Sequence, residues 1–522
     1  QTLKMISTWR RKALTATAVL FGAAGAVEVY RATDRFEDLR QIGLIRFGRA
    51  AITVGKIVLD YKTSLWNVPY PSEEYTASMQ GAHSRSAVRL LHLASANGGV
   101  FIKVGQHCAS LEYLLPREYT KTLSVLLSKA PASSFEDVKE VVEQELKCKL
   151  EDVFVEFSET PCGAASLAQV HVAKLKRSGE KLAVKVQHRR VKKNARTDTN
   201  TMQALVKVTD LLFPEFKLNW LVEEVKKNLP LELDFENEGR NADRLREMVL
   251  HLSFLKVPEV KWDLTTSRVL TMEFCEGEHI DKKDFMIANG IDRHDVCRKL
   301  GRLISEMVFI RGYLHCDPHP GNVLVHKKAD GKTQIVLLDH GLYLTLADDF
   351  RMLYSSLWLA LLRADQDEIK RVARAMGVGE LYGLFACMVT RRSWKSVTQG
   401  INKSTLNESE RKELRAYAVS LIPQISQVLQ RMPREMLLIL KTNDLLRGIE
   451  HSLGCAGRSD GLIEMSKCVV SSWHSLAISR AHSWREKWRL RFSLFYSLAR
   501  LLVYDYALRI NFILPQRLQL AL

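Results

Sequence analysis

Two segments near the middle of the chain carry acidic and amide side chains at a spacing that suits phosphoryl transfer from ATP. In HCDPHPGNVL, Asp317 and Asn322 are five positions apart, and Asp339 follows seventeen positions later in VLLDHG. Protein-kinase catalytic loops place an acid, an amide and a second acid in this order. Asp317 is predicted to orient or deprotonate the attacking hydroxyl or water, whereas Asn322 and Asp339 are predicted to give oxygen ligands to Mg2+.

A lysine and a loop for the nucleotide phosphates precede these segments. Lys185 lies in KLAVKVQ, whose alternation is typical of a strand and turns this side chain away from Leu182 and Val184. Upstream, where a kinase has its glycine-rich loop, only one glycine is present. Alanine resists the positive φ angles that glycine permits, so a stiff loop with altered nucleotide preference is expected. The predicted nucleotide-binding loop comprises Cys162, Gly163, Ala164, Ala165, Ser166, Leu167, Ala168, Gln169 and Val170.

The bulk composition describes a globular chain with a basic charge. Its 522 residues, 46% of them hydrophobic, can bury a core in two lobes with extensions. The 76 basic and 59 acidic side chains give a net charge of +17, which suits an anionic membrane or a nucleotide. No nucleic-acid-binding motif accompanies this charge, so no nucleic-acid partner is expected. The nine cysteines contain no Cys-x-x-Cys pair, and reduced core thiols are predicted.

The first thirty residues have the composition of a targeting segment. No acid precedes Glu28, several residues are basic, and ALTATAVLFGAAGAV is apolar. This pattern favours a mitochondrial presequence with a membrane anchor, while a secretory signal core or mere alanine-rich composition stays open. Ala18, Gly22 and Ala26 recur every four residues, which permits a homodimer through this helix.

Periodicity indicates the elements that position the chemistry. The helical pattern from about residue 84 to 129 is interrupted at Gly98 and Gly99, and Ser134 is placed to cap a further helix. Alternation in AQVHVAKL and KLAVKVQ predicts two paired strands. The segment MEFCEG follows an apolar strand and ends in a glycine, so its backbone is expected to meet the adenine. After about residue 350 the chain is predicted to be helical.

The tail from Arg480 to Leu522 mixes basic and aromatic side chains. It has eight Arg or Lys residues against Glu486 and Asp505. Such a segment suits an anionic bilayer, with its rings at the headgroup level. The sequence slightly favours the other reading, a final helix packed on the large lobe with a solvated basic face. The interleaved aromatic residues are Trp484, Trp488, Phe492, Phe495, Tyr496, Tyr504 and Tyr506.

With these residues in hand, the chain resembles the UbiB family of atypical kinase-like proteins, also called aarF-domain or ADCK proteins, over roughly residues 82–448. The resemblance is carried by KVGQ, GAASLAQVH, ELDFENE, HCDPHPGN and LLDHG. NLPLELDFENEGRNA and LKTNDLLRG look most like a mitochondrial branch of that family. The resemblance implies that Glu238 pairs with Lys185 and that ATP and Mg2+ are the cofactors.

The family likeness also assigns a role to the KxGQ segment. In UbiB proteins this helix folds over the active site and occupies the space where a kinase would accept a peptide. By resemblance, Lys103 would reach Glu232 and Asp234, and Gln106 would share its helical face. Gly105 would allow another backbone to approach closely. Such a lysine would be costly to bury without its acids.

The chain departs from standard protein kinases in three places. The catalytic loop has His-Cys-Asp in place of His-Arg-Asp, and no Ala-Pro-Glu element follows. Activation-loop phosphorylation is therefore not expected as a switch. His340 replaces the usual phenylalanine after Asp339, and it is expected to pack or hydrogen-bond rather than titrate in catalysis.

The predicted fold class is α+β, a kinase-like two-lobed fold with helical extensions at both ends. The predicted segments are a targeting segment and anchor (1–30), a KxGQ extension (31–150), a small lobe (151–277), a large lobe (278–450) and a basic helical extension (451–522). The leading functional hypothesis is an ATPase or atypical kinase in mitochondrial lipid, quinone or membrane homeostasis, associated with the inner membrane and a lipid surface. The alternatives are a nucleotide-gated pseudokinase scaffold and a conventional Ser/Thr kinase. The substrate stays open.

Overall fold

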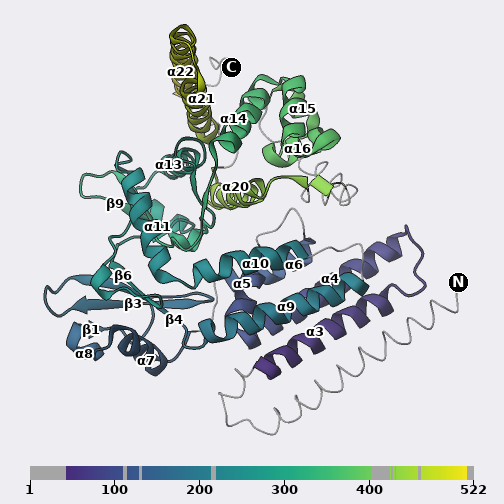
Figure 1. Cartoon of the computed structure of the whole chain (residues 1–522), viewed down its shortest axis with the longest axis vertical. Coiled ribbons are helices and arrows are strands. Elements are labelled where there is room, and N and C mark those ends of the chain that lie inside the picture. Colours follow the sequence, from purple (N-terminus) through teal and green to yellow (C-terminus); the bar gives the residue numbers. More distant parts are fainter. Residues whose placement is uncertain are drawn as a thin grey trace. The chain divides into compact units, whose positions relative to one another are not determined.

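The computed structural model describes residues 43–109, 115–127, 132–212, 219–400, 424, 427–428, 431–455 and 460–513 (Figure 1). The chain divides into two compact units, the first of residues 1–240 with 259–274 and the second of residues 241–258 with 275–522. The chain thus passes from one unit to the other within MEFCEG, after Phe274. The predicted targeting segment and its small-residue face lie outside the described residues. All nine cysteines are free thiols.

The sheet of unit 1 is antiparallel and is built on the two predicted strands. β3 and β4 coincide with the two alternating segments and pair along their length, with Val170 opposite Lys185. The order is β1-β3-β4-β6, with β2 paired to β3. Leu182 and Val184 point into the core while Lys185 is half-buried on the other face, as the alternation predicts. The remaining strands are β1 (Phe154–Phe157), β2 (Gly163–Ala164), β3 (Ala168–Leu175), β4 (Lys181–Gln187) and β6 (Val269–Glu273).

One helix of unit 1 packs on this sheet, and the other helices lie before it and between its strands in the sequence. Ser134 accepts a hydrogen bond from the backbone N–H of Asp137, 3.3 Å away, and so caps α7 as predicted. Val138, Val141 and Val142 of α7 pack with the sheet core. The helices of unit 1 are α3 (Gly43–Ser64), α4 (Glu73–Asn97), α5 (Val100–Ala109), α6 (Arg117–Leu123), η1 (Ser124–Leu127), α7 (Phe135–Leu146), α8 (Leu150–Val153), α9 (Val191–Leu212), α10 (Asn219–Glu232), η2 (Trp262–Leu264) and α11 (Phe235–Met248), which continues into unit 2 beyond residue 240.

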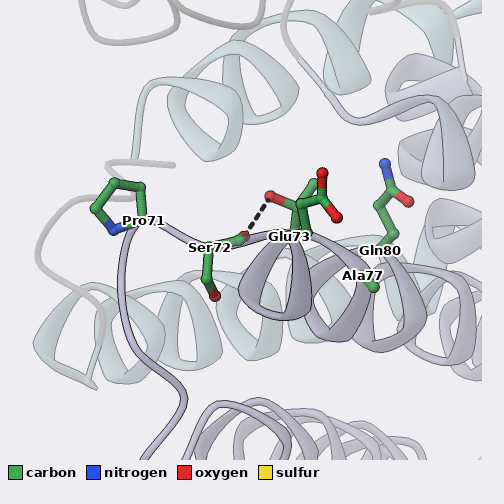
Figure 2. A pocket seen from close by; sticks show the side chains of 6 residues that line it. Pro71, Ser72, Glu73, Ala77 and Gln80 are labelled. Carbon is green, nitrogen blue, oxygen red and sulfur yellow. Dashed lines mark hydrogen bonds between the residues drawn. The ribbon is translucent and has the colours of Figure 1, made fainter.

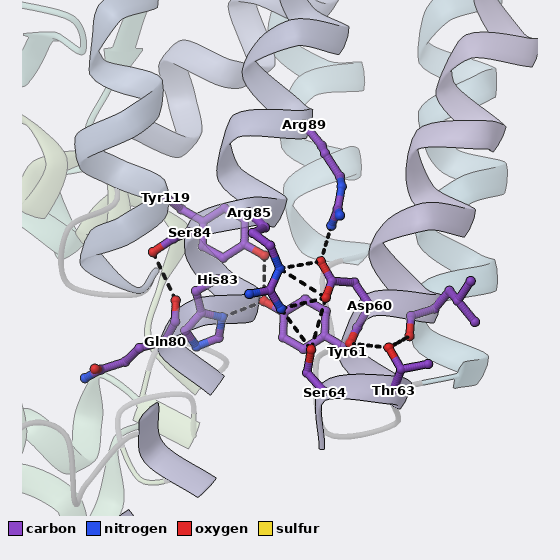
Figure 3. A network of polar contacts seen from close by, with 11 residues as sticks. Asp60, Tyr61, Thr63, Ser64, Gln80, His83, Ser84, Arg85, Arg89 and Tyr119 are labelled. Atoms are coloured by element: carbon purple, nitrogen blue, oxygen red, sulfur yellow. Dashed lines mark hydrogen bonds and ion pairs between the residues drawn. The ribbon is translucent and has the colours of Figure 1, made fainter. Parts of the chain in front are cut away.

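Polar contacts tie α3, α4 and α6 together (Figure 3). Asp60 accepts hydrogen bonds from Arg85 and Arg89, and the bonds from Arg85 hold the pKa of this carboxyl well below its usual range. The Tyr61 hydroxyl lies 2.7 Å from that of Tyr119. Asp60, Arg85 and Arg89 therefore each have a partner of opposite charge.

Unit 2 combines two small sheets with a helical body. Its first sheet has the order β5-β10-β9-β7, and its second pairs β8 with β11. The strands are β5 (Leu255–Lys256), β7 (Glu278–His279), β8 (Tyr313–His315), β9 (Val323–Lys327), β10 (Thr333–Leu337) and β11 (Tyr343–Thr345). Among the described residues, the helices of this unit are α12 (Lys283–Ala288), α13 (Arg293–Ser305), η3 (Glu306–Arg311), η4 (Pro320–Asn322), α14 (Asp348–Arg363), α15 (Gln366–Ala375), η5 (Gly379–Leu381), α16 (Tyr382–Thr390), α17 (Trp394–Gln399), α20 (Arg434–Ser452), α21 (Asp460–Arg480) and α22 (Trp484–Ile513).

The last two helices form an antiparallel hairpin, seen edge-on in Figure 1. Lys467 of α21 pairs with Asp505 of α22 at 2.9 Å, and His474 Nε2 of α21 lies 3.1 Å from the Ser493 hydroxyl of α22. Within the described part of the chain, no helix is both long enough and apolar enough to cross a membrane. The contacts between α21 and α22 show that the basic tail begins as a packed helix.

Candidate active site

Unit 1 holds the predicted phosphate-binding lysine against a buried acid. The Lys185 ammonium lies 2.6 Å from the Glu238 carboxylate, whose side chain is 2% exposed, whereas that of Lys185 is 12% exposed. Glu238 lies near the start of α11, and β4 presents Lys185 on the face opposite the sheet core. A buried carboxylate without a partner of opposite charge is costly, so Glu238 fixes the position of the Lys185 ammonium.

The KxGQ lysine makes a second pair of the same kind. The Lys103 ammonium lies 2.6 Å from the Glu232 carboxylate, with side-chain exposures of 16% and 6%. Asp234 accepts a hydrogen bond from the backbone N–H of Glu236 and pairs with Arg240 at 3.5 Å. Glu232 is thus the acid that the structure brings to Lys103, and Asp234 supports the first turn of the helix that carries Glu238.

Gly105 and Gln106 connect the KxGQ helix to its surroundings. A methyl group at Gly105 would lie 2.4 Å from Leu126 Cδ1, so glycine makes room for a buried side chain rather than for the backbone approach expected from sequence. The Gln106 amide donates to the carbonyl of Leu126 at 2.9 Å and accepts from the Ser166 hydroxyl at 3.2 Å. The KxGQ helix therefore contacts the predicted nucleotide loop directly.

The predicted nucleotide-binding loop is a tight hairpin between β2 and β3. Ala165 and Ala168 close its tip with a backbone hydrogen bond of 2.8 Å. Its residues keep negative φ angles, which is why alanine can replace glycine here without strain. The His188 ring donates to the Ala165 carbonyl at 3.0 Å, and its backbone N–H donates to Leu167. His188 thus holds the tip through hydrogen bonds to two of its carbonyls, which is consistent with the stiff loop expected from the sequence.

In unit 2 the buried ring of His315 joins the predicted catalytic loop to Asp339. His315 Nδ1 accepts from the backbone N–H of Asp317 at 3.0 Å, and Nε2 donates to the Asp339 carbonyl at 2.5 Å. A neutral ring with its proton on Nε2 satisfies both partners. Burial lowers the pKa of His315 below its ordinary value of 6.5, and this outweighs the opposing effect of its bond to Asp339.

Backbone contacts bring the two predicted magnesium ligands to neighbouring positions. Asn322 Nδ2 donates to the Asp317 carbonyl at 3.2 Å, and the Asn322 carbonyl accepts from the N–H of Leu338, next to Asp339. The amide nitrogen of Asn322 is thereby engaged, which leaves its side-chain oxygen for a metal. One amide and one carboxylate oxygen suit Mg2+, which keeps several waters and substrate phosphates as its other ligands. The donor set fits the ion.

Lys441 is a site residue that the sequence reasoning did not identify. Its ammonium on α20 lies 3.0 Å from Asp317 Oδ1, and its side chain is 7% exposed, against 30% for Asp317. The signal was present, because LLILKTNDLL places one lysine inside an apolar helical run. A lysine that faces a core needs an acid beside it.

His340 has no free ring nitrogen for proton transfer. Nδ1 lies 2.8 Å from the Tyr343 hydroxyl, and Nε2 donates to the Leu337 carbonyl at 3.0 Å. The ring is buried and stacks on Tyr343. It supports the segment after Asp339, in line with the packing role expected from sequence.

A surface hollow of about 480 Å3 at the start of α4 contains none of these residues (Figure 2). Pro71, Ser72 and Glu73 line one end, and Ala77 and Gln80 the other. The Ser72 hydroxyl caps α4 by accepting from the Tyr75 N–H at 2.9 Å. The hollow is a feature of a helix start and adds nothing to the site.

Comparison with known proteins identifies the type of domain. The model of the ABC1 atypical kinase-like domain matches residues 125–373. The Gallus gallus protein named AarF domain-containing protein kinase 1 is 50% identical over 462 residues, 88% of this chain and 89% of that protein. The Drosophila melanogaster protein named AarF domain-containing kinase 1 is 46% identical over 468 residues, 87% of this chain and 90% of that protein. Among solved structures, a Mycobacterium tuberculosis protein in complex with erythromycin aligns over 74% of this chain and 100% of its own, at 20% identity and a TM-score of 0.44.

Proposed function

This chain belongs to the UbiB family of ABC1 atypical kinase-like proteins, and from that premise we propose that it binds ATP with Mg2+ and transfers the γ-phosphoryl group to water or to an acceptor hydroxyl. One observation carries the proposal. Asp317, Asn322 and Asp339 are linked through His315 and the Leu338 backbone into one constellation, with an acid for the nucleophile and two oxygen donors for the metal.

The residues of unit 1 are proposed to hold the nucleotide. Lys185 would neutralise phosphate charge, with Glu238 fixing its position. The hairpin tip would lie over the phosphates and present small side chains to them. Mg2+ would be held by Asn322 and Asp339, and when bound it would neutralise charge that develops on the phosphates. Asp317 would orient the attacking oxygen and accept its proton.

The cellular setting is proposed from the family and the N-terminal composition. We propose a mitochondrial protein associated with the inner membrane, acting in lipid, quinone or membrane homeostasis on a small or membrane-embedded acceptor. Support comes from the basic, acid-poor start of the chain and its apolar run. Fluorescence microscopy of the chain with and without residues 1–30 tests the localisation, and mitochondrial retention of the shortened chain would move the signal elsewhere.

The ion pair in unit 2 favours one alternative, a nucleotide-gated scaffold without productive transfer. Lys441 lies 3.0 Å from the Asp317 carboxylate, so this carboxylate is engaged in an ion pair and is less available to accept a proton from a nucleophile. A scaffold would bind ATP and Mg2+ and would need no turnover.

Phosphate release from Mg2+-ATP separates the two functions. The measurement compares the wild-type chain with Asp317→Asn, because asparagine keeps the shape of the side chain and removes the base. Asp330→Asn, in an exposed turn of the same unit, is the matched control. Release that falls by about a hundredfold in Asp317→Asn alone supports transfer, in line with the usual contribution of a general base. ATP binding with equal, background release from all three proteins would mean a scaffold.

A further inference from the structure

The outward face of α22 carries a row of aromatic and aliphatic side chains. With about 100° of rotation per residue, these side chains fall within about one third of the helix circumference, so they lie on one side of the helix. Each is between 58% and 72% exposed. Isolated exposed apolar residues need no explanation, but a row along a whole helix face does. The row consists of Trp484, Trp488, Phe492, Phe495, Tyr496, Leu502, Val503 and Tyr506.

This row is distinct from the face that packs against α21. The packed face carries Ser493, which meets His474, and Asp505, which meets Lys467. Leu490, Leu494 and Leu501 are partly covered, and Leu498 shares their side of the helix. α22 is therefore apolar on two sides, and only one of them is covered by the described residues.

Basic side chains border the aromatic row on both edges. With about 100° of rotation per residue, Arg489 and Arg500 fall along one edge of the row and Lys487 and Arg491 along the other. All four side chains are exposed. The Arg491 guanidinium lies 5.8 Å from the centre of the Trp488 ring. The long stems of these residues can follow the apolar row while their charged ends reach outward.

We propose that this face of α22 lies in the surface of an anionic bilayer, with the helix parallel to the membrane plane. Trp and Tyr prefer the headgroup level, and the flanking cations would meet lipid phosphates. Charge decides against a second copy of the chain as the occupant, because two such faces would bring their basic edges together. The proposal deepens the membrane setting proposed above and does not depend on the phosphoryl chemistry.

The first test measures binding of the full chain to vesicles by co-sedimentation. Phosphatidylcholine vesicles with and without about one third phosphatidylserine or cardiolipin are compared at two salt concentrations. The wild-type chain is expected to bind the anionic vesicles and to lose binding at high salt. The variant Trp488→Ser, Phe492→Ser, Phe495→Ser is expected to bind at least tenfold more weakly. Trp66→Ser, which removes a comparably exposed ring from the turn after α3, is expected to bind as the wild type does.

The second test places the contact on α22 itself. Brominated lipids quench tryptophan fluorescence only at close range, so wild-type fluorescence is expected to fall on vesicle binding. Trp484→Phe, Trp488→Phe should lose most of that quenching while still binding. Arg489→Gln, Arg491→Gln, Arg500→Gln should lose the preference for anionic lipid.

Two results would overturn the inference. Undiminished vesicle binding by the triple serine variant would place membrane contact elsewhere in the chain. A concentration-dependent dimer that this variant abolishes, without vesicle binding by the wild type, would make a second copy the occupant. ATP binding by the same variants keeps the two proposals apart, since loss of vesicle binding with intact ATP binding concerns α22 alone.

Discussion

Both units place a lysine beside a carboxylate, but they bury opposite partners. In unit 1 the acid is the more deeply buried member, at 2% for Glu238 against 12% for Lys185. In unit 2 the lysine is the more deeply buried one, at 7% for Lys441 against 30% for Asp317. In each ion pair, the packing around the more deeply buried side chain fixes its position, whereas the more exposed side chain can contact a ligand.

Under the proposed function, this difference indicates which member of each pair would act on the nucleotide or the acceptor. Lys185 and Asp317 are the accessible ends, and they are also the residues that kinase chemistry needs on the phosphates and on the attacking oxygen. Glu238 and Lys441 are then positioning residues. The pair of Lys103 with Glu232 follows the pattern of unit 1, with the acid again deeper than the lysine.

Breaking the pair of unit 2 is expected to have the largest effect. Lys441→Met keeps the apolar stem and removes the charge that holds Asp317, so phosphate release should fall by about ten- to a hundredfold, as misplaced catalytic groups do. ATP affinity should stay within about twofold. Release assays and calorimetric titrations check this, and Lys441→Arg should recover part of the rate. An increase in release would mean that Lys441 restrains Asp317 instead of positioning it.

Breaking the pair of unit 1 is expected to change binding instead. Glu238→Gln leaves Lys185 without its buried anion, and ATP affinity should fall about tenfold, as expected for loss of a charged hydrogen bond. Calorimetric titration of ATP measures the change. Glu236→Gln, on the same helix turn but beside Arg240, is the matched control and should bind ATP as the wild type does. Equal losses in both variants would remove the positioning role of Glu238.

The stability of the KxGQ helix in unit 1 is expected to depend on close packing at Gly105. Gly105→Ala must displace Leu126, which costs about 1 to 3 kcal/mol of unfolding free energy, as overpacking does in other cores. Gly448→Ala, at a helical glycine with open space around it, should be neutral or slightly stabilising. Urea unfolding of both variants gives the comparison. Equal stability of the Gly105→Ala and Gly448→Ala variants would mean that α5 can move away from Leu126 at no cost.

The folding stability of unit 2 is expected to depend on pH through His315. Because the folded pKa lies below 6.5, the unfolded chain takes up this proton first as the pH falls. The stabilisation from neutral His315 is therefore complete above about pH 6.5 and is lost on acidification. His315→Asn should lower overall stability but lose less of it than the wild type between pH 7.5 and 5.5. Parallel curves would show that His315 does not titrate in this window.

Features set by neighbouring residues could be predicted from the sequence. The bounds of β3 and β4, the Ser134 cap and the half-buried position of Lys185 all follow from local patterns. The spacing of Asp317, Asn322 and Asp339 is also local, because one hairpin and its flanks carry all three.

Contacts between distant segments could not be predicted in the same way. Lys441 reaches Asp317 across 124 positions, and Gln106 reaches Ser166 across 60. Spacing within a segment says nothing about which loop a distant helix faces. The tail illustrates the same limit, because both faces of α22 are apolar and only the structure shows that α21 covers one of them.

The most direct test of the division of labour measures ATP binding and phosphate release in Lys185→Ala and Asp317→Asn side by side, with Mg2+ present. We expect a crossed result, in which Lys185→Ala loses ATP affinity at least tenfold, whereas Asp317→Asn keeps its ATP affinity while phosphate release falls by about a hundredfold. Loss of affinity in Asp317→Asn together with unchanged binding in Lys185→Ala would contradict it.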